Sequence, residues 1–280
     1  MNEENVRSRR IPVSLIVMLI GVVILIIGII VWKVGGVDKY IKIENFSVTN
    51  QPVDEIDTIE LDIGDAEFKI VRGTTDRLSL VAENVPEGEY DHGIRDGKFV
   101  LKRKPGFSLL LPQVTRWFSE SDLTPKITLT LPDKEFKRVD LDLGTGTTVI
   151  EDIRAVDLDL DLGAGQAVVR NLKVSGDTDL DLGVGEARFE NCDVNRLDID
   201  GGVGRFTFTG TITGSLDADC GVGESDITII GNANDYDIDV DNGLGDVDIE
   251  KGDTSVGGTK HIPVKIDGGV GAIKLKFVKQ

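Results

Sequence analysis

The sequence predicts an all-β fold, in which a single-stranded parallel β-solenoid (β-helix) of about seven Asp- and Gly-rich coils follows an irregular β cap and one transmembrane α-helix. Three observations support this interpretation. Gly-x-Gly pairs recur along the C-terminal half, beginning at Gly144, Gly163, Gly183, Gly202, Gly221, Gly243 and Gly269. Apolar and polar residues alternate on both sides of each pair, as in a strand with one dry face. Near the N-terminus, the run from Ile11 to Trp32 contains no charged side chain.

The uncharged run covers residues 11–32 and has the length of a membrane-spanning helix. As an α-helix it would be about 33 Å long, against about 30 Å for the apolar core of a bilayer. A secretory signal peptide has a shorter apolar core of about 7–15 residues, and no Ala-x-Ala cleavage site follows this run. We therefore expect an uncleaved anchor with residues 1–10 as its cytoplasmic tail, because three arginines precede the run. This single-pass topology places the C-terminal domain outside the cell.

The predicted extracellular part carries all of the acidity. The chain has a formal net charge of −18 at pH 7. Residues 1–32 contain three arginines and two glutamates, so they have a net charge of +1 and the remainder has −19. A surface of this sign repels phosphate groups, which disfavours nucleic acid and anionic lipid headgroups as partners.

Residues 33–55 are expected to form a linker, and residues 56–138 an irregular β cap. The segment from Glu60 to Ile70 is a degenerate copy of the repeat, with Ala66 in place of the second glycine. Alternating runs predict three further strands, at 78–82, 99–103 and 127–131. Terminal units of solenoids are atypical, which fits a cap at this position.

An apolar insert at residues 104–124 lies between the predicted cap strands. It contains Phe107, Leu110, Trp117 and Phe118, and two prolines argue against one long helix. Two interpretations stay open. The insert could cover the end of the solenoid core, or it could be an exposed interaction patch that contacts the membrane or a partner.

The repetitive solenoid is expected over residues 139–280, with its columns divided between two faces. Apolar residues three before each first glycine should point inward. They are Leu141, Leu160, Leu180, Ile199, Ala218, Val240 and Ile266. Aspartates two before each first glycine should point outward. They are Asp142, Asp161, Asp181, Asp200, Asp219, Asp241 and Asp267. A second aspartate column, four residues before the glycine, is interrupted only by Lys265. The glycines suit a tight corner, where a Cβ would obstruct the stacking of backbones.

The two cysteines are expected to be free. Cys192 and Cys220 fall in inward-facing columns of different coils, about two coil heights apart. That separation is larger than the Cα distance a disulfide tolerates. Small buried apolar side chains are the expected role.

The order of motifs resembles a known family. The phrases are Ile59-Glu-Leu-Asp-Ile-Gly-Asp-Ala-Glu-Phe-Lys-Ile70, Gly97-Lys-Phe-Val-Leu-Lys102 and Ile127-Thr-Leu-Thr-Leu-Pro132, followed by the Asp/Gly repeats. From Ile56 to the C-terminus the chain is similar to the bacterial putative adhesin family, also called toast-rack, which is related to the head domains of autotransporter-like proteins. Similar ectodomains occur in Lia-type cell-envelope stress systems. The resemblance implies a membrane-anchored envelope protein and supplies no catalytic residues.

The outward aspartates carry a repulsive cost that needs an explanation. Carboxylates about 4.8 Å apart repel by about 1 kcal/mol per neighbour in water. Solvation, salt screening and hydrogen bonds from turn amides form one explanation. Divalent cation binding, chiefly Ca²⁺, is the other, since Ca²⁺ accepts several carboxylate oxygens. The candidate metal ligands are Asp142, Asp161, Asp181, Asp200, Asp219 and Asp241.

An enzyme is the rival class of function. Pairs such as Asp159 and Asp161 could lie about 5–7 Å apart, near the carboxylate spacing of glycosidases. Catalysis needs one pair whose two pKa values differ, whereas here every coil repeats the same pair. His92 and His261 are far apart in sequence and lie near no nucleophile motif. We therefore expect no catalytic residues and no cofactor.

The sequence predicts a membrane-anchored, extracytoplasmic, non-catalytic binding or scaffold module of the cell envelope. Its partners would be the membrane, through residues 11–32, and an envelope protein or wall polymer. The resemblance adds a role as an accessory to cell-envelope stress signalling. The alternative is a surface adhesin-like structural rod with cation-binding Asp columns, and the remote alternative is a carbohydrate-active hydrolase.

Overall fold

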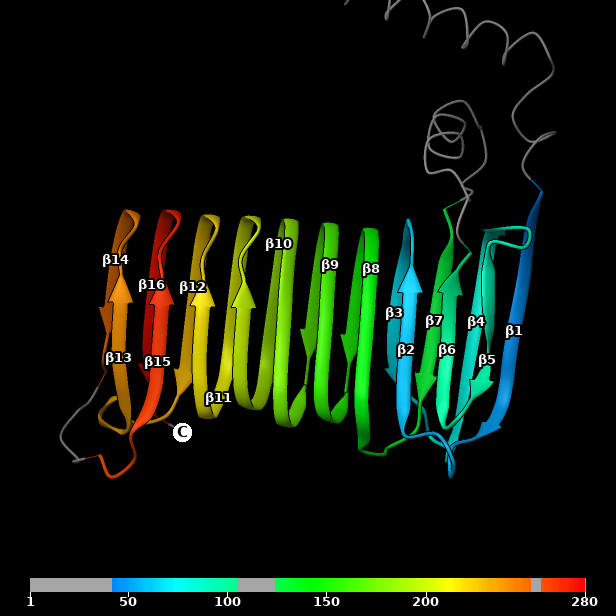
Figure 1. Cartoon of the computed structure of the whole chain (residues 1–280), viewed down its shortest axis with the longest axis horizontal. Helices are drawn as coiled ribbons and strands as arrows, with labels where there is room; N and C mark the ends of the chain where they lie inside the picture. The colour runs from blue at the N-terminus through cyan, green and yellow to red at the C-terminus, as the bar shows by residue number, and fades with distance from the viewer. Residues whose placement is uncertain (1–41, 105–123, 253–257, 280) are drawn as a thin grey trace, which may run out of the picture. The chain divides into compact units, whose positions relative to one another are not determined.

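The computed structural model describes residues 42–104, 124–252 and 258–279 and is built almost wholly of strands (Figure 1). The predicted all-β class is confirmed: the described residues form sixteen strands and one short 3-10 helix at Ala233–Asp235. No helix in these ranges is long and apolar enough to cross a membrane. The predicted anchor at 11–32 lies outside the described residues, as does the predicted patch, which consists of Phe107, Leu110, Trp117 and Phe118.

Strands before residue 132 pair in both directions. Antiparallel pairs join β1 (Ile43–Pro52) to β4 (Arg77–Pro86), β4 to β7 (Lys126–Leu131), and β5 (Tyr90–Arg95) to β6 (Lys98–Arg103). Parallel pairs join β2 (Thr58–Ile63) to β6, and β3 (Ala66–Arg72) to β7. The three runs expected to be strands fall within β4, β6 and β7. The structure differs from the expected linker at β1, where Phe46 and Val48 pack against the core.

The later strands are long, parallel and in register. They are β8 (Phe136–Glu151), β9 (Arg154–Arg170), β10 (Lys173–Asp200), β11 (Val203–Asp219) and β12 (Val222–Ile230). Each of β8 and β9 continues through its Gly-x-Gly corner, so that both of its halves pair with the next coil, and β10 is long enough to continue into the coil after its own corner. Gly165 is opposite Gly146 on one side and Gly185 on the other. Figure 1 shows β8 to β12 side by side, each bending at its corner.

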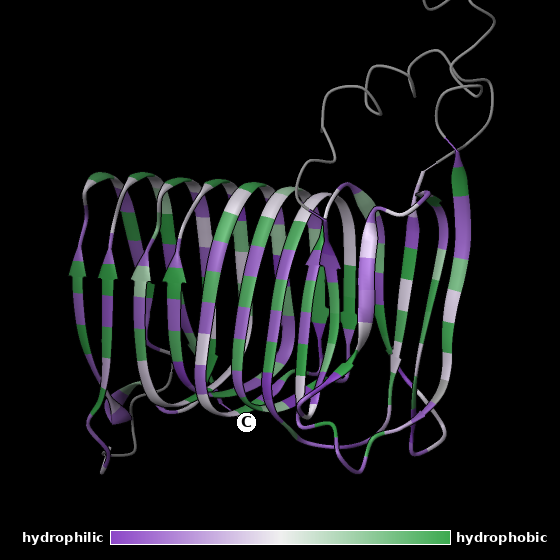
Figure 2. Ribbon diagram, turned by 45° about the vertical axis from the view of Figure 1, so that its right-hand side comes forward, coloured by the Kyte–Doolittle hydropathy of each residue, from purple (hydrophilic) through white to green (hydrophobic). Residues whose placement is uncertain are grey.

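The predicted inward columns form the core. Leu141, Leu160, Leu180 and Ile199 are all buried in one hydrophobic cluster that continues from the first strands to β16. Figure 2 shows apolar and polar residues alternating along each strand. Cys192 is buried and Cys220 half-buried, and both thiols are free, which confirms the expectation of no disulfide.

The last two coils do not follow sequence order. β13 (Tyr236–Asp241) and β14 (Leu244–Glu250) precede β15 (Ile262–Asp267) and β16 (Val270–Val278) in the chain. In space, β15 pairs with β11 on one side and β13 on the other, and β16 lies between β12 and β14. The coil formed by β15 and β16, the last in the sequence, therefore lies between the coil of β11 and β12 and the coil of β13 and β14 (Figure 1). The spacing between glycine pairs is wider from Gly221 to Gly243 and from Gly243 to Gly269, where the chain crosses over to make this exchange of order.

Candidate functional site

Two acidic columns, which we call ladder A and ladder B, run along the outward face of the strands that precede the glycine corners. Neighbouring residues of each ladder are paired partners on adjacent strands, except within β10, where Asp179 and Asp198, and Asp181 and Asp200, lie one repeat apart on the same strand. Ladder A consists of Glu60, Asp140, Asp159, Asp179, Asp198, Asp217, Lys265 and Asp239. Ladder B consists of Asp62, Asp142, Asp161, Asp181, Asp200, Asp219, Asp267 and Asp241. The structure thus aligns all six candidate metal ligands in one row.

Basic side chains relieve the repulsion in ladder A at several rungs. Arg138 lies 2.8 Å from Asp159 and 3.7 Å from Asp140. Lys98 and Lys102 both pair with Glu60. At the other end, Lys265 lies 3.5 Å from Asp217 and 2.5 Å from Asp267 of ladder B. Sequence reasoning missed Arg138, which precedes the alternating pattern by one residue.

The middle of ladder B has no such compensation. Within the described ranges, no ion pair involves Asp142, Asp161, Asp181 or Asp200. Burial, followed by repulsion from Asp159 and other ladder carboxylates, raises the pKa of Asp161. Ionisation of Asp161 at neutral pH therefore destabilises the folded chain.

The same causes act along both ladders. Burial raises the pKa of Asp62, with a further contribution from Asp142. Burial and then a neighbouring ladder carboxylate also raise the pKa values of Asp140, Asp179 and Asp198.

Turn amides bind two of the ladder carboxylates. Asp219 accepts a hydrogen bond from the Gly221 N–H at 3.2 Å, and Asp241 accepts one from the Gly243 N–H at 3.1 Å. These bonds agree with the expected turn contacts at these two corners. Over the residues that the structure covers, no group of three or more His, Cys, Asp or Glu side chains is arranged to hold a metal ion.

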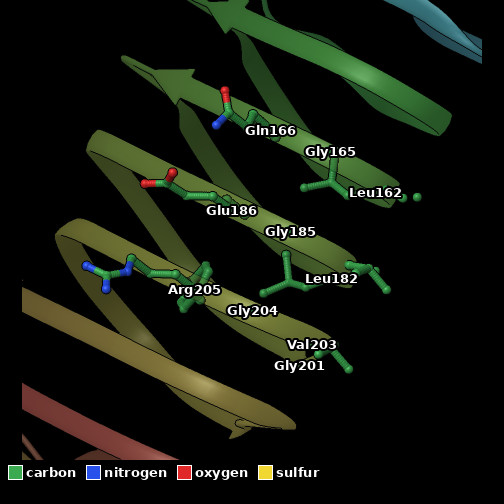
Figure 3. A pocket seen from close by; sticks show the side chains of 18 of the residues that line it. Leu162, Gly165, Gln166, Leu182, Gly185, Glu186, Gly201, Val203, Gly204 and Arg205 are labelled. Atoms are coloured by element: carbon green, nitrogen blue, oxygen red, sulfur yellow. The ribbon is translucent and has the colours of Figure 1, made fainter.

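The glycine corner permits a close stacking of backbones. A Cβ on Gly185 would lie 1.9 Å from the carbonyl oxygen of Gly165, and the φ of Gly185 is +138°. The residue between the glycines points outward and forms an exposed row that sequence reasoning missed. Its apolar members are Ala164, Val184, Val203, Val222, Val270 and Leu244. Figure 3 shows three successive corners, with Leu162 and Leu182 on the opposite side of the glycines from Gln166 and Glu186.

A narrow cavity of about 60 Å³ lies at these corners (Figure 3). Its lining residues come from five coils and include Leu182, Ala187 and Phe206. Large and small side chains exchange places between neighbouring coils. Gly201 stands at the position of Leu182 in the next coil, and Phe206 stands at the position of Ala187.

The thiols of Cys192 and Cys220 are protonated and therefore poor nucleophiles. Burial raises the pKa of the Cys192 thiol to about 12 and raises that of Cys220 as well. Both therefore remain protonated at neutral pH, and the thiol is not a nucleophile in that form. His92 stacks on Phe46 with ring centroids 4.6 Å apart, whereas His261 lies 3.3 Å from Asp237. The structure brings neither histidine to a cysteine.

A third column, also missed, stabilises the opposite corner. Asp152, Asn171 and Asn191 have φ values of 60°, 56° and 57°. The Asn171 amide donates to Asp152 at 3.1 Å, and the Asn191 amide donates to Asn171 at 2.6 Å. Asn and Asp tolerate this left-handed conformation better than other residues with side chains. These three residues recur with the same period as the glycines, and this was the signal available in the sequence.

Comparisons with known proteins give similarities to solved structures alone. No family model and no curated protein matches the chain. A cell adhesion protein from Clostridium sporogenes, described as putative, is 15% identical, with a TM-score of 0.32, over 85% of this chain and 100% of that chain. A putative adhesin from Bacteroides fragilis is 15% identical, with a TM-score of 0.35, over 84% and 97%. A putative lipid binding protein from Parabacteroides distasonis is 14% identical, with a TM-score of 0.36, over 83% and 96%. None of these similarities defines a ligand.

Removing ladder charge should stabilise the fold at neutral pH. The raised pKa values mean that Asp161 and Asp179 ionise less readily in the folded chain than in the unfolded chain. Their contribution to stability is complete below the ordinary pKa of 3.8 and is lost as the pH rises through the folded pKa. Asp161→Asn with Asp179→Asn should therefore raise Tm at pH 7, by roughly 2–4 °C per kcal/mol of repulsion removed. Calorimetric melts should show the gain shrinking as the pH approaches 4.

Asp177→Asn is the matched control for this experiment. A hydrogen bond from Arg196 lowers the pKa of Asp177, so its carboxylate stabilises the fold above the unfolded pKa. This variant should lower Tm at pH 7. A lower Tm in the ladder variant as well would contradict the assigned repulsion.

Proposed function

We propose that this chain is a membrane-anchored, extracytoplasmic, non-catalytic binding or scaffold module whose coils form a β-solenoid. The observation that carries the proposal is the repetition of the same outward side chains along ladders A and B. A uniform row presents an extended surface, whereas catalysis requires a few differing groups that converge. Solenoids use such extended surfaces for binding.

The parallel, in-register pairing supports the solenoid. The pairs that join β8 to β9, β9 to β10, β10 to β11 and β11 to β12 connect equivalent positions of successive glycine repeats, as expected if each coil is one turn of the repeat. About seven such coils, at about 4.8 Å each, would make a rod roughly 34 Å long. The irregular cap would close its N-terminal end.

The anchor and the orientation are supported by the sequence. The uncharged run at 11–32 is long enough to span a bilayer, and the arginines before it favour a cytoplasmic N-terminus. The acidic C-terminal domain would then be extracellular, where an envelope protein or a wall polymer is the partner. A role as an accessory to cell-envelope stress signalling follows from the family resemblance.

Protease accessibility tests the orientation. Protease added to intact cells or protoplasts should remove the C-terminal domain and a tag placed after Gln280, because both lie outside the membrane. A cytoplasmic tag placed before Met1 should survive until lysis and serves as the control. A C-terminal tag that stays protected until lysis would show that the proposed topology is wrong.

A surface rod with cation-binding ladders is the second candidate. It is favoured by the uncompensated carboxylates in the middle of ladder B, which includes Asp161 and Asp181. A bound cation stabilises by RT ln(1 + [L]/Kd), about 2.7 kcal/mol at a hundredfold excess over Kd. Plain screening depends on ionic strength and not on the identity of the ion.

Melting the chain in CaCl₂, MgCl₂ and NaCl at matched ionic strength separates the two candidates. We expect equal Tm shifts in all three salts, because the ladder aligns its carboxylates in a row instead of gathering them around one point. A larger shift in Ca²⁺ would instead support the cation-binding rod. That shift should then disappear when Asp161, Asp181 and Asp200 are changed to Asn.

A further inference from the structure

We propose that the outermost coil, formed by β13 and β14, is a docking site for an extended partner segment in which Lys or Arg alternates with apolar residues. The segment would add to the sheet as the next pair of strands. This inference deepens the binding function proposed above, because it assigns the partner's chemistry and the surface that receives it.

The first argument is the open sheet edge. Among the described residues, β13 pairs only with β15, and β14 only with β16. One edge of each strand therefore presents backbone N–H and C=O groups without a strand partner. Such an edge is a template for strand addition unless it is covered.

The second argument is the uncovered end of the hydrophobic core. Ile249 is 37% exposed, whereas Leu275, its paired residue one coil inward, is 0% exposed. Val240 is partly buried, whereas its partner Ile266 is fully buried. An added coil with apolar residues at the inward positions would remove the side chains of Ile249 and Val240 from water, which is favourable.

The third argument is the charge of the outermost coil. Apart from the corner residues, its outward side chains are all acidic, and they are Asp237, Asp239, Asp241, Asp246, Asp248 and Glu250. No ion pair within the described ranges involves Asp239 or Asp246. Since like charges on opposed edges repel, this edge is unfavourable for the same edge of a second copy.

The molecule already contains the type of strand that such an edge accepts. The neighbouring coil, formed by β15 and β16, carries Lys265, Lys274 and Lys276 at outward positions. Lys265 is in register between Asp217 and Asp239. Lys274 lies 3.8 Å from Asp248 and 2.5 Å from Glu250, and Lys276 lies 3.2 Å from Glu250. A basic strand outside β14 would repeat this alternation of acidic and basic coils.

A labelled peptide with the sequence of Val270–Val278 is the probe, because β14 already pairs with that sequence on its inner side. Its fluorescence anisotropy is measured against the purified full chain. We expect saturable binding that weakens by roughly tenfold or more from low to high salt. A control peptide with Glu in place of both lysines should not bind.

Two N-methylated peptides test whether the backbone is used. Each carries methyl groups on one of the two alternating sets of amides, which keeps the charge and removes one row of N–H donors. We expect at least one of them to lose binding. Equal binding by both would show that charge alone holds the peptide and would overturn the proposal.

Chain variants locate the site. Asp239→Lys with Asp246→Lys should weaken binding by roughly tenfold or more. Asp76→Lys with Glu83→Lys makes the same change of charge just before and within β4, far from the outermost coil in the strand order, and should leave binding unchanged. Equal loss in both variants would overturn the proposal, as would a concentration-dependent dimer that the first variant abolishes, since a second copy would then occupy the edge. If the first variant fails to fold, the N-methylated peptides still test whether the segment pairs through its backbone. The protease test of orientation does not depend on this edge, so the two proposals can fail separately.

Discussion

Parallel pairing in register places each side chain of this fold against its equivalents in the coils on either side, about 4.8 Å away. Every column must therefore be compatible with itself. Leucine and isoleucine columns pack into a continuous core, and the Asn191–Asn171–Asp152 column bonds along its own length. Glycine columns stack because no Cβ intervenes, since a Cβ on Gly185 would lie only 1.9 Å from a carbonyl oxygen of the neighbouring coil. Aspartate columns are the exception, because like charges repel at this spacing.

The arrangement of basic residues follows from that exception. Arg138 lies between Asp140 and Asp159, and lysines pair with Glu60 at the first rung. The order of the last coils has the same physical basis. Stacking in sequence order would place Asp239 directly against Asp217, whereas the observed order inserts Lys265 between them. The crossover thus replaces a repulsive contact in ladder A with the ion pair between Lys265 and Asp217, and it leaves an acidic coil at the open end.

Local periodicity was enough to predict the strands of the repeats, the corners and the inward columns, because each depends on alternation within a single repeat. The order of the last coils could not be predicted in this way, because the units before Gly243 and Gly269 have the same alternating pattern. Only Lys265, the one basic residue in an aspartate column, distinguished them. The exposed row that contains Val184 was missed for a different reason, since the residue between two glycines has no fixed face until the corner geometry is known.

Disulfide trapping tests most directly the order in which the last coils stack. In a background with Cys192→Ala and Cys220→Ala, Asp217→Cys with Lys265→Cys should form a disulfide under mild oxidation, because these positions are paired on adjacent strands. Asp217→Cys with Asp239→Cys should not, because the inserted coil separates them by about 9.6 Å, or two strand spacings. A disulfide between positions 217 and 239, without one between 217 and 265, would mean that the coils stack in sequence order and would contradict this account.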